Sequence, residues 1–286
     1  MARQPTNLHQ RVREVLRHVT PLSLQADSPI RHFESSVNVG SSLLKYIDDH
    51  IDPADVYGAV YEGHLGHLRR MILAEMIESF EQYLKELAAL CVDTLAPYAT
   101  DDRFDDFLPK RGGTIAAFVH ASSIGKALCE SDTWLSNTSI NDRIASLLKE
   151  PYGDNWQLLF PGPTRQPIGE RERAATLAVL WQIRHNLAHN VGVLTHSDSM
   201  KFRLLSGLQV PTDCRLSPTT EDLRFTKRFL TETAVRTNDR VGNRLAELMT
   251  TFHLADPALF DAQATADLLS NRFKFPLAVD GCTGTP

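Results

Sequence analysis

The chain of 286 residues contains little cysteine, and its four cysteines lie far apart without a C-x-x-C pair. This spacing argues against a disulfide framework and a structural zinc site, and it is typical of thiols that stay reduced. No uninterrupted apolar run approaches the length of a membrane span, and the N-terminus lacks the apolar core of a signal peptide. We therefore expect a cytoplasmic protein without a membrane partner.

An excess of positive charge is also missing, because the formal net charge is −5 at pH 7. The chain as a whole has no electrostatic attraction to nucleic acid, so any RNA site must be a local basic patch. Cations gather in residues 191–216, which we expect to form a partly basic rim, and on one side of residues 220–252, our second choice for contacts to phosphates. The cations of these two segments are Lys201, Arg203, Arg215, Arg224, Lys227, Arg228, Arg236, Arg240 and Arg244.

Apolar residues at helical spacing are the main positive signal. They predict helices over residues 8–19, 37–47, 53–95, 115–129, 140–148, 170–190 and 220–252. The proline-rich and glycine-rich residues 151–169 predict a loop, and residues 191–216 show little periodicity.

This pattern predicts an all-α fold, an antiparallel helical bundle with additional N-terminal helices and irregular loops. We divide the chain into an N-terminal helical extension (1–60), a helical core (61–255) and a peripheral C-terminal tail (256–286).

The segment 170–190 organises the rest of the chain. Acidic residues in its first turn favour a helix N-terminus, and Asn190 followed by Gly192 predicts a left-handed stop. Projection at 100° per residue places polar Gln182, Asn186 and Asn190 on one side of the helix. The opposite, apolar side carries Leu177, Leu180, Trp181, Leu187, Ala188 and Val191.

Arg184 falls in the middle of the apolar side of this helix. A guanidinium does not lose its proton, and burying it without a partner costs about 3 to 5 kcal/mol. We therefore expect an anionic group to face Arg184.

The run Arg184-His185-Asn186-Leu187-Ala188-His189 resembles the R-x4-6-H motif of HEPN-domain proteins. The resemblance implies a helical bundle that forms a homodimer through the motif helix. Many such proteins are metal-independent endoribonucleases in toxin–antitoxin, anti-phage or RNA-processing systems. By this resemblance Arg184 and His189 are the catalytic residues, and His185 takes the polar second position.

Three further residues are candidates for substrate-binding or supporting roles beside His185. Asn190 follows the motif directly. Glu81 and Lys85 resemble an acidic residue and a lysine that some HEPN members carry on an early helix of the cleft. A salt bridge on the solvated side of the helix, where Glu78 also falls, explains Glu81 and Lys85 at least as well, and we favour that interpretation.

The chemistry implied by the resemblance needs no metal and no cofactor. A histidine with a pKa near neutrality moves the proton of the 2′-hydroxyl or of the leaving 5′-oxygen, a task that suits His189. The planar guanidinium of Arg184 suits the charged phosphorane. The expected products from RNA are a 2′,3′-cyclic phosphate and a 5′-hydroxyl. A toxin of this kind would also have an antitoxin or regulatory protein as its partner.

Two alternatives remain open. The chain could be an inactive helical module that binds RNA, a nucleotide or a protein, with Arg184 neutralised by an internal carboxylate. His185 and His189 also have the i,i+4 spacing of a two-histidine metal site. However, Asn186 stands where H-E-x-x-H has glutamate, and no compelling third ligand lies nearby in the sequence.

Overall fold

The computed structural model describes residues 28–50, 58–98, 103–104, 123–129, 134–149, 160 and 168–286. The helices are α2 (Pro29–His50), α3 (Gly58–Leu95), α5 (Ile124–Cys129), α6 (Asn137–Leu148), α7 (Ile168–Asn190), α8 (His196–Ser206), α9 (Thr220–Ala255) and α10 (Ala262–Phe273). One antiparallel hairpin, β1 (Ala278–Val279) with β2 (Cys282–Thr283), follows α10. The predicted all-α fold is confirmed.

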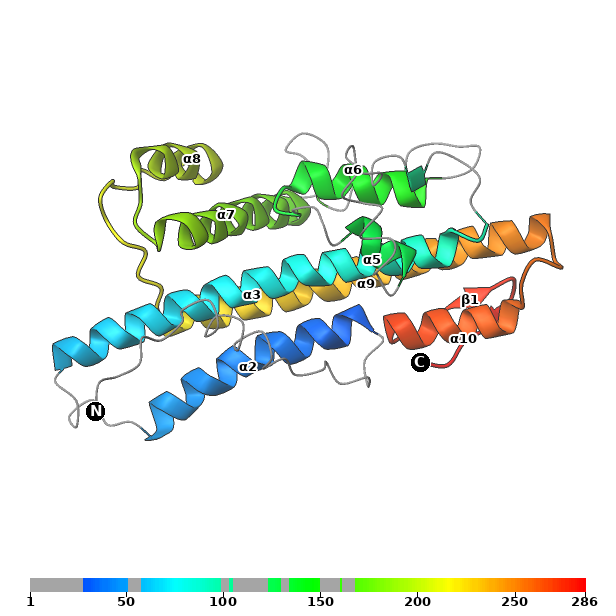
Figure 1. The fold of residues 1–286 in the computed structure, drawn as a ribbon, viewed down its shortest axis with the longest axis horizontal. Coiled ribbons are helices and arrows are strands. Elements are labelled where there is room, and N and C mark those ends of the chain that lie inside the picture. The colour runs from blue at the N-terminus through cyan, green and yellow to red at the C-terminus, as the bar shows by residue number, and fades with distance from the viewer. Residues whose placement is uncertain are drawn as a thin grey trace, which may run out of the picture.

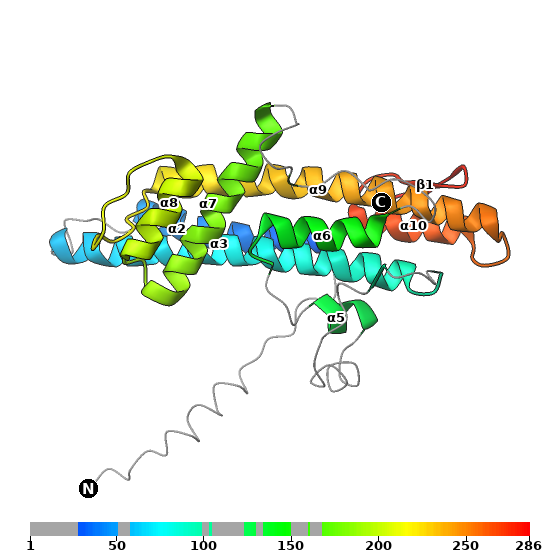
Figure 2. The same ribbon diagram turned by 90° about the horizontal axis from the view of Figure 1, so that it is seen from above.

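The two longest helices, α3 and α9, lie side by side along the length of the molecule (Figures 1 and 2). Helices α2 and α10 pack below them in Figure 1, and α7 crosses α3 on the opposite side with α8 above it. Within the described residues, no helix is long and apolar enough to span a bilayer.

Helices α2 and α3 are antiparallel, but the central pair of α3 and α9 is parallel. Contacts from His32 to Glu86 and from Gly40 to Ile72 show that α2 runs against α3. By contrast, α3 and α9 run in the same direction, because Tyr83 contacts Ala234, and Tyr98, in the turn just after α3, contacts Phe252 further along α9. A parallel pair requires a long crossover connection, and residues 96–219, which include α7, provide it.

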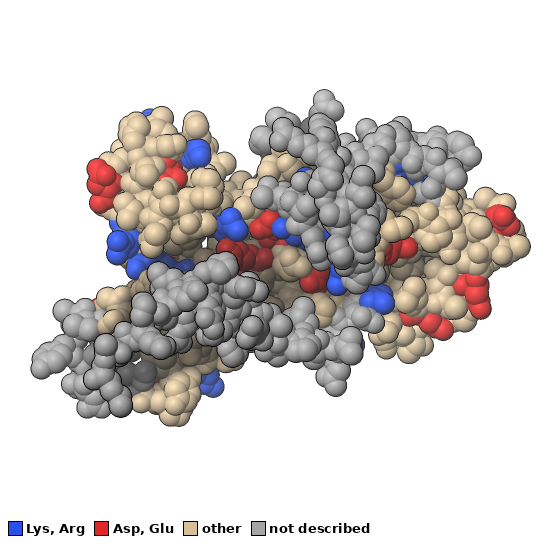
Figure 3. All heavy atoms as spheres, viewed as in Figure 1, with Lys and Arg blue, Asp and Glu red and all other residues tan. Residues whose placement is uncertain are grey.

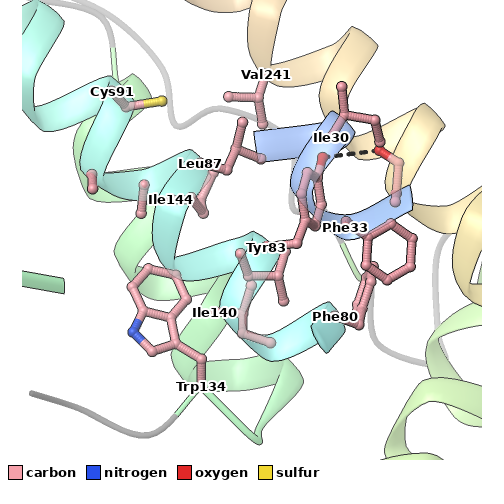
Figure 4. Packing of buried hydrophobic residues seen from close by; sticks show 14 of the residues in the cluster. Ile30, Phe33, Phe80, Tyr83, Leu87, Cys91, Trp134, Ile140, Ile144 and Val241 are labelled. Carbon is pink, nitrogen blue, oxygen red and sulfur yellow. Dashed lines mark hydrogen bonds between the residues drawn. The ribbon is translucent and has the colours of Figure 1, made fainter. Parts of the chain in front are cut away.

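Apolar residues at helical spacing along α3 form a seam at the centre of the core. Phe80, Tyr83, Leu84, Leu87 and Cys91 of this seam are buried. The rings of Phe33, Phe80 and Tyr83 meet between α2 and α3 (Figure 4). The Tyr83 hydroxyl donates a hydrogen bond of 2.9 Å to the carbonyl of Ala234, which satisfies a buried polar group and ties α3 to α9.

The C-terminal segment 256–286 is not the peripheral tail that we expected. Phe273, Leu277 and Val279 are buried in the same cluster as the α3 seam. Asn238 of α9 donates a hydrogen bond of 2.7 Å to the carbonyl of Phe273. A Cβ at Gly284 would lie 2.0 Å from the carbonyl oxygen of Ala266, so the chain after β2 packs directly on the α10 backbone. Our prediction failed because α10 is short and its apolar positions are few.

Several predicted boundaries also change. Helix α2 begins at Pro29, before the helix predicted over residues 37–47. Arg31 and His32 therefore lie on a helix, although no periodic pattern predicted one there. Helix α6 begins after Ser136. Residues 191–216 contain helix α8, where we predicted no regular structure. The helix predicted over residues 8–19 lies outside the described residues.

Candidate functional site

Helix α7 is held on α3 by aromatic packing. Leu177, Leu180 and Trp181 are buried. The ring of Trp181 stacks on Phe80 with 5.9 Å between centroids, and its indole nitrogen donates a hydrogen bond of 3.1 Å to Asn137 of α6. This packing fixes the middle of α7 on α3. The C-terminal end of the helix follows and carries Arg184 to Asn190.

Arg184 faces α3 and meets a carboxylate there, as predicted. Its Nη2 lies 3.4 Å from Oε1 of Glu78, and its side chain is 23% exposed. The expectation that Glu78 points to the solvated side of α3 is thus only partly right, because its 51% exposed carboxylate reaches Arg184. An ion pair with one exposed partner contributes about 1 kcal/mol or less. The Nε of Arg184 is buried and has no hydrogen-bond partner among the described residues.

His185 and His189 lie on the exposed side of α7. Their ring centroids are 4.6 Å apart and the rings are tilted by 48°. Burial lowers the pKa of His185, and the nearby charges of His189 and Lys201 lower it further, while Asp198 opposes the shift. These effects favour the neutral form of His185. Because Arg184 turns toward Glu78 of α3, the structure does not bring Arg184 and His189 of one chain to a common face.

The polar side of α7 packs against α8. Asp198 is 2% exposed, and its carboxylate accepts hydrogen bonds of 3.1, 2.9 and 2.8 Å from Gln182, Asn186 and Asn190. The backbone amide and hydroxyl of Thr195 donate to the same carboxylate. Burial alone raises the pKa of Asp198, but the hydrogen bonds from Thr195, Asn186 and Asn190 outweigh it and hold this pKa below its ordinary value.

Asn186 also fixes the turn that ends α7. It is fully buried, and its amide nitrogen donates a second hydrogen bond of 2.8 Å to the carbonyl of Val193. The predicted left-handed stop is confirmed, since Val191 has φ 52° and Gly192 has φ 81°. A Cβ at Gly192 would lie 3.0 Å from Cδ of Arg70, so the turn packs closely on α3.

Asp198 was not predicted from the sequence, although two signals for it were present. The pattern Thr195-x-x-Asp198 is a capping box, which the structure shows at the start of α8. The amides of Gln182, Asn186 and Asn190 recur every four residues, and such a stripe can mark a polar contact rather than solvent. Helix α8 escaped detection because only Asp198 and Phe202 are buried in it.

Glu81 and Lys85 form the predicted ion pair, but not on a solvated surface. Their charged atoms are 3.2 Å apart, and their side chains are 7% and 17% exposed. Glu81 also accepts a hydrogen bond of 3.0 Å from the backbone amide of Trp134. This pair anchors the chain before α6 to α3, and its described contacts do not include His189.

In the part of the chain that the structure describes, no metal site coincides with the motif, and the cleft between α2, α3 and α9 lies elsewhere. There, no group of three histidine, cysteine or carboxylate side chains is placed to hold a metal ion with His185 and His189. A cleft of about 370 Å³ lies between α2, α3 and α9, and its lining residues do not include the motif. These lining residues are Ser41, Leu44, Lys45, Asp48, Asp49, Met76, Thr220, Leu223, Arg224 and Lys227.

No protein-family model, curated protein or solved structure was found to match the chain.

Proposed function

We propose that the protein is a metal-independent endoribonuclease of HEPN type that acts as a toxin or an anti-phage effector. The supporting observation is the C-terminal end of α7. It presents a partly exposed guanidinium and two exposed, adjacent imidazoles on a segment that Asp198 holds in place. A rigid element with these groups suits general acid–base catalysis on a phosphodiester.

In the proposed reaction His189 takes the proton of the ribose 2′-hydroxyl. The 2′-oxygen then bonds to phosphorus, the bond from phosphorus to the 5′-oxygen breaks, and a second imidazole protonates the leaving oxygen. Arg184 neutralises the phosphorane, and the phosphate oxygens take the place of the Glu78 carboxylate. The products are a 2′,3′-cyclic phosphate and a 5′-hydroxyl.

The proposal requires a homodimer. Arg184 and His189 of one helix diverge by about 140°, so two copies of α7 related by a two-fold axis would supply one cleft with both groups. Apolar side chains near the motif support a contact between two copies: Val191, Met200, Leu204 and Leu208 are 63%, 43%, 81% and 66% exposed. Exposed apolar groups gathered at one end of a molecule are typical of an interface. An antitoxin or regulatory protein could then act by covering this end.

The test is a cleavage assay on total RNA in EDTA, with wild type beside His189→Ala and Arg184→Ala. We expect cleavage by the wild type, with cyclic phosphate and 5′-hydroxyl ends, and loss of cleavage in both variants while their circular dichroism is unchanged. Intact RNA with the wild type, or equal cleavage by His189→Ala, would refute the proposal.

A second candidate is an inactive helical module of the same kind that binds RNA, a nucleotide or a protein. The Arg184–Glu78 ion pair favours it, because an arginine that already has a carboxylate partner can be structural. Under this alternative the wild type leaves RNA uncut and Arg184→Ala has only the small loss of stability of an ion pair, whereas a nuclease would lose its cleavage activity on the same substitution.

A further inference from the structure

Two arginines lie near the end of α7, beside the motif. Nη1 of Arg70 on α3 donates a hydrogen bond of 3.3 Å to the carbonyl of Leu216. Its Cδ lies against Gly192, which follows the motif by three residues. Arg215 precedes Leu216 and forms an isolated β-bridge with Val193, so its backbone also lies beside this turn.

Among the described residues, neither Arg70 nor Arg215 forms an ion pair with a carboxylate. Partial burial lowers the pKa of Arg70, and the charge of Arg215 lowers it further, as like charges do when no anion separates them. Figure 3 shows Lys and Arg side chains below the lobe that holds α8, with Asp and Glu side chains beside them.

We infer that Arg70 and Arg215 form a phosphate-binding site for the backbone of single-stranded RNA, at a nucleotide next to the scissile one. The inference rests on the proposed function for the choice of RNA. Planar guanidinium groups bind phosphate oxygens through paired hydrogen bonds, and a pair of them without carboxylates is attractive to an anion. The site lies directly after the α7 helix, so a strand that reaches His189 passes it.

The competing explanation is structural. Arg70 could serve only to hold the turn after α7, through Leu216 and the partial negative charge at the helix end. Arg215 separates the two explanations, because its side chain is exposed and makes no described hydrogen bond. Removing the charge of Arg215 therefore changes binding without disturbing the fold.

The experiment measures binding of a fluorescein-labelled single-stranded RNA of about 20 nucleotides by fluorescence polarisation at several salt concentrations. All proteins carry His189→Ala, so that the RNA stays intact. Arg215→Gln and Arg70→Gln are compared with the parent and with Arg31→Gln, which removes the same charge from an exposed position on α2. We expect Arg215→Gln to weaken binding about threefold to tenfold. The slope of log affinity against log salt concentration should become shallower by about 0.7 for each phosphate that is no longer neutralised.

Arg31→Gln should bind RNA as the parent does. Equal binding by Arg215→Gln and the parent, or an equal loss in Arg31→Gln, would overturn the inference. If Arg70→Gln fails to fold, as judged by circular dichroism, Arg215→Gln alone decides. No saturable binding by the parent would also overturn it.

The two proposals fail in different ways. If the protein with His189 intact leaves RNA uncut while binding still depends on Arg215, the nuclease proposal fails and the phosphate site stands. If that protein cuts RNA and Arg215→Gln changes neither its KM nor its binding, the phosphate site fails and the nuclease proposal stands.

Discussion

The guanidinium of Arg184 lies 3.4 Å from the carboxylate of Glu78, on the helix that α7 crosses. This pair joins the proposed phosphate-binding arginine to a protein anion. A substrate phosphate has to compete with Glu78 for the same donors, so the strength of the pair affects both stability and substrate binding.

Glu78→Gln should therefore make Arg184 more available to RNA. We expect kcat/KM for RNA cleavage to rise about twofold to fivefold, with a change in unfolding free energy below about 1 kcal/mol because Glu78 is half exposed. Cleavage kinetics and urea denaturation measure the two effects. Glu75→Gln, at an exposed position on the same helix, is the control and should change neither. A large loss of stability without a gain in rate would instead favour the structural role of Arg184.

Asp198→Asn should destabilise the protein by about 2 to 4 kcal/mol. The substitution replaces one carboxylate oxygen, which accepts hydrogen bonds, with an amide NH2 group that can only donate them. The substitution should also free the end of α7 and reduce cleavage. Urea denaturation checks the first effect. The exposed Asp213 provides the matched variant Asp213→Asn, whose stability should stay close to wild type. Wild-type stability of Asp198→Asn would show that Asp198 does not hold α7.

The depressed pKa of Asp198 also gives a pH dependence. The folded-state pKa lies below the unfolded one, so this carboxylate stabilises the protein fully above the unfolded pKa of about 3.9, and the stabilisation is lost as pH falls through the folded value. The unfolding free energy of the wild type should fall steeply in this pH range. The unfolding free energy of Asp198→Asn should fall less over the same pH range, and an equal slope would contradict the assignment.

Lys201→Gln should raise the pKa of His185. Burial makes the larger contribution to its depression, so the shift on removing the Lys201 charge is expected to be partial. NMR titration of the histidine ring signals measures it, and the ring of His50, at the end of α2, provides the reference signal. A downward shift, or none, would show that Lys201 does not act on His185.

Leu204→Glu combined with Leu208→Glu should disrupt the proposed dimer. Both side chains are largely exposed in one chain, so the charges cost little in the monomer and much in an apolar interface. Multi-angle light scattering should show a monomer, and cleavage should be lost while the melting temperature is kept. Leu43→Glu, at an exposed position on α2, is the control with no effect on mass. A wild-type monomer would exclude a dimeric site.

The sequence alone determined the elements with strong periodicity. The α3 seam, the buried face of α9 and the left-handed end of α7 follow from residue spacing, because a helix buries whatever lies on one side of it. The need for an anion facing Arg184 also follows from the cost of burying a charge.

Only the tertiary structure decided which groups meet. Helix α8 and the segment around Phe273 have few apolar positions, so their burial depends on partners far away in the sequence. Periodicity marked the amides of Gln182, Asn186 and Asn190 as polar, but it could not distinguish solvent from the buried carboxylate of Asp198. The choice of Glu78 as the partner of Arg184 depends in the same way on where α7 crosses α3, which is set by packing and not by local sequence.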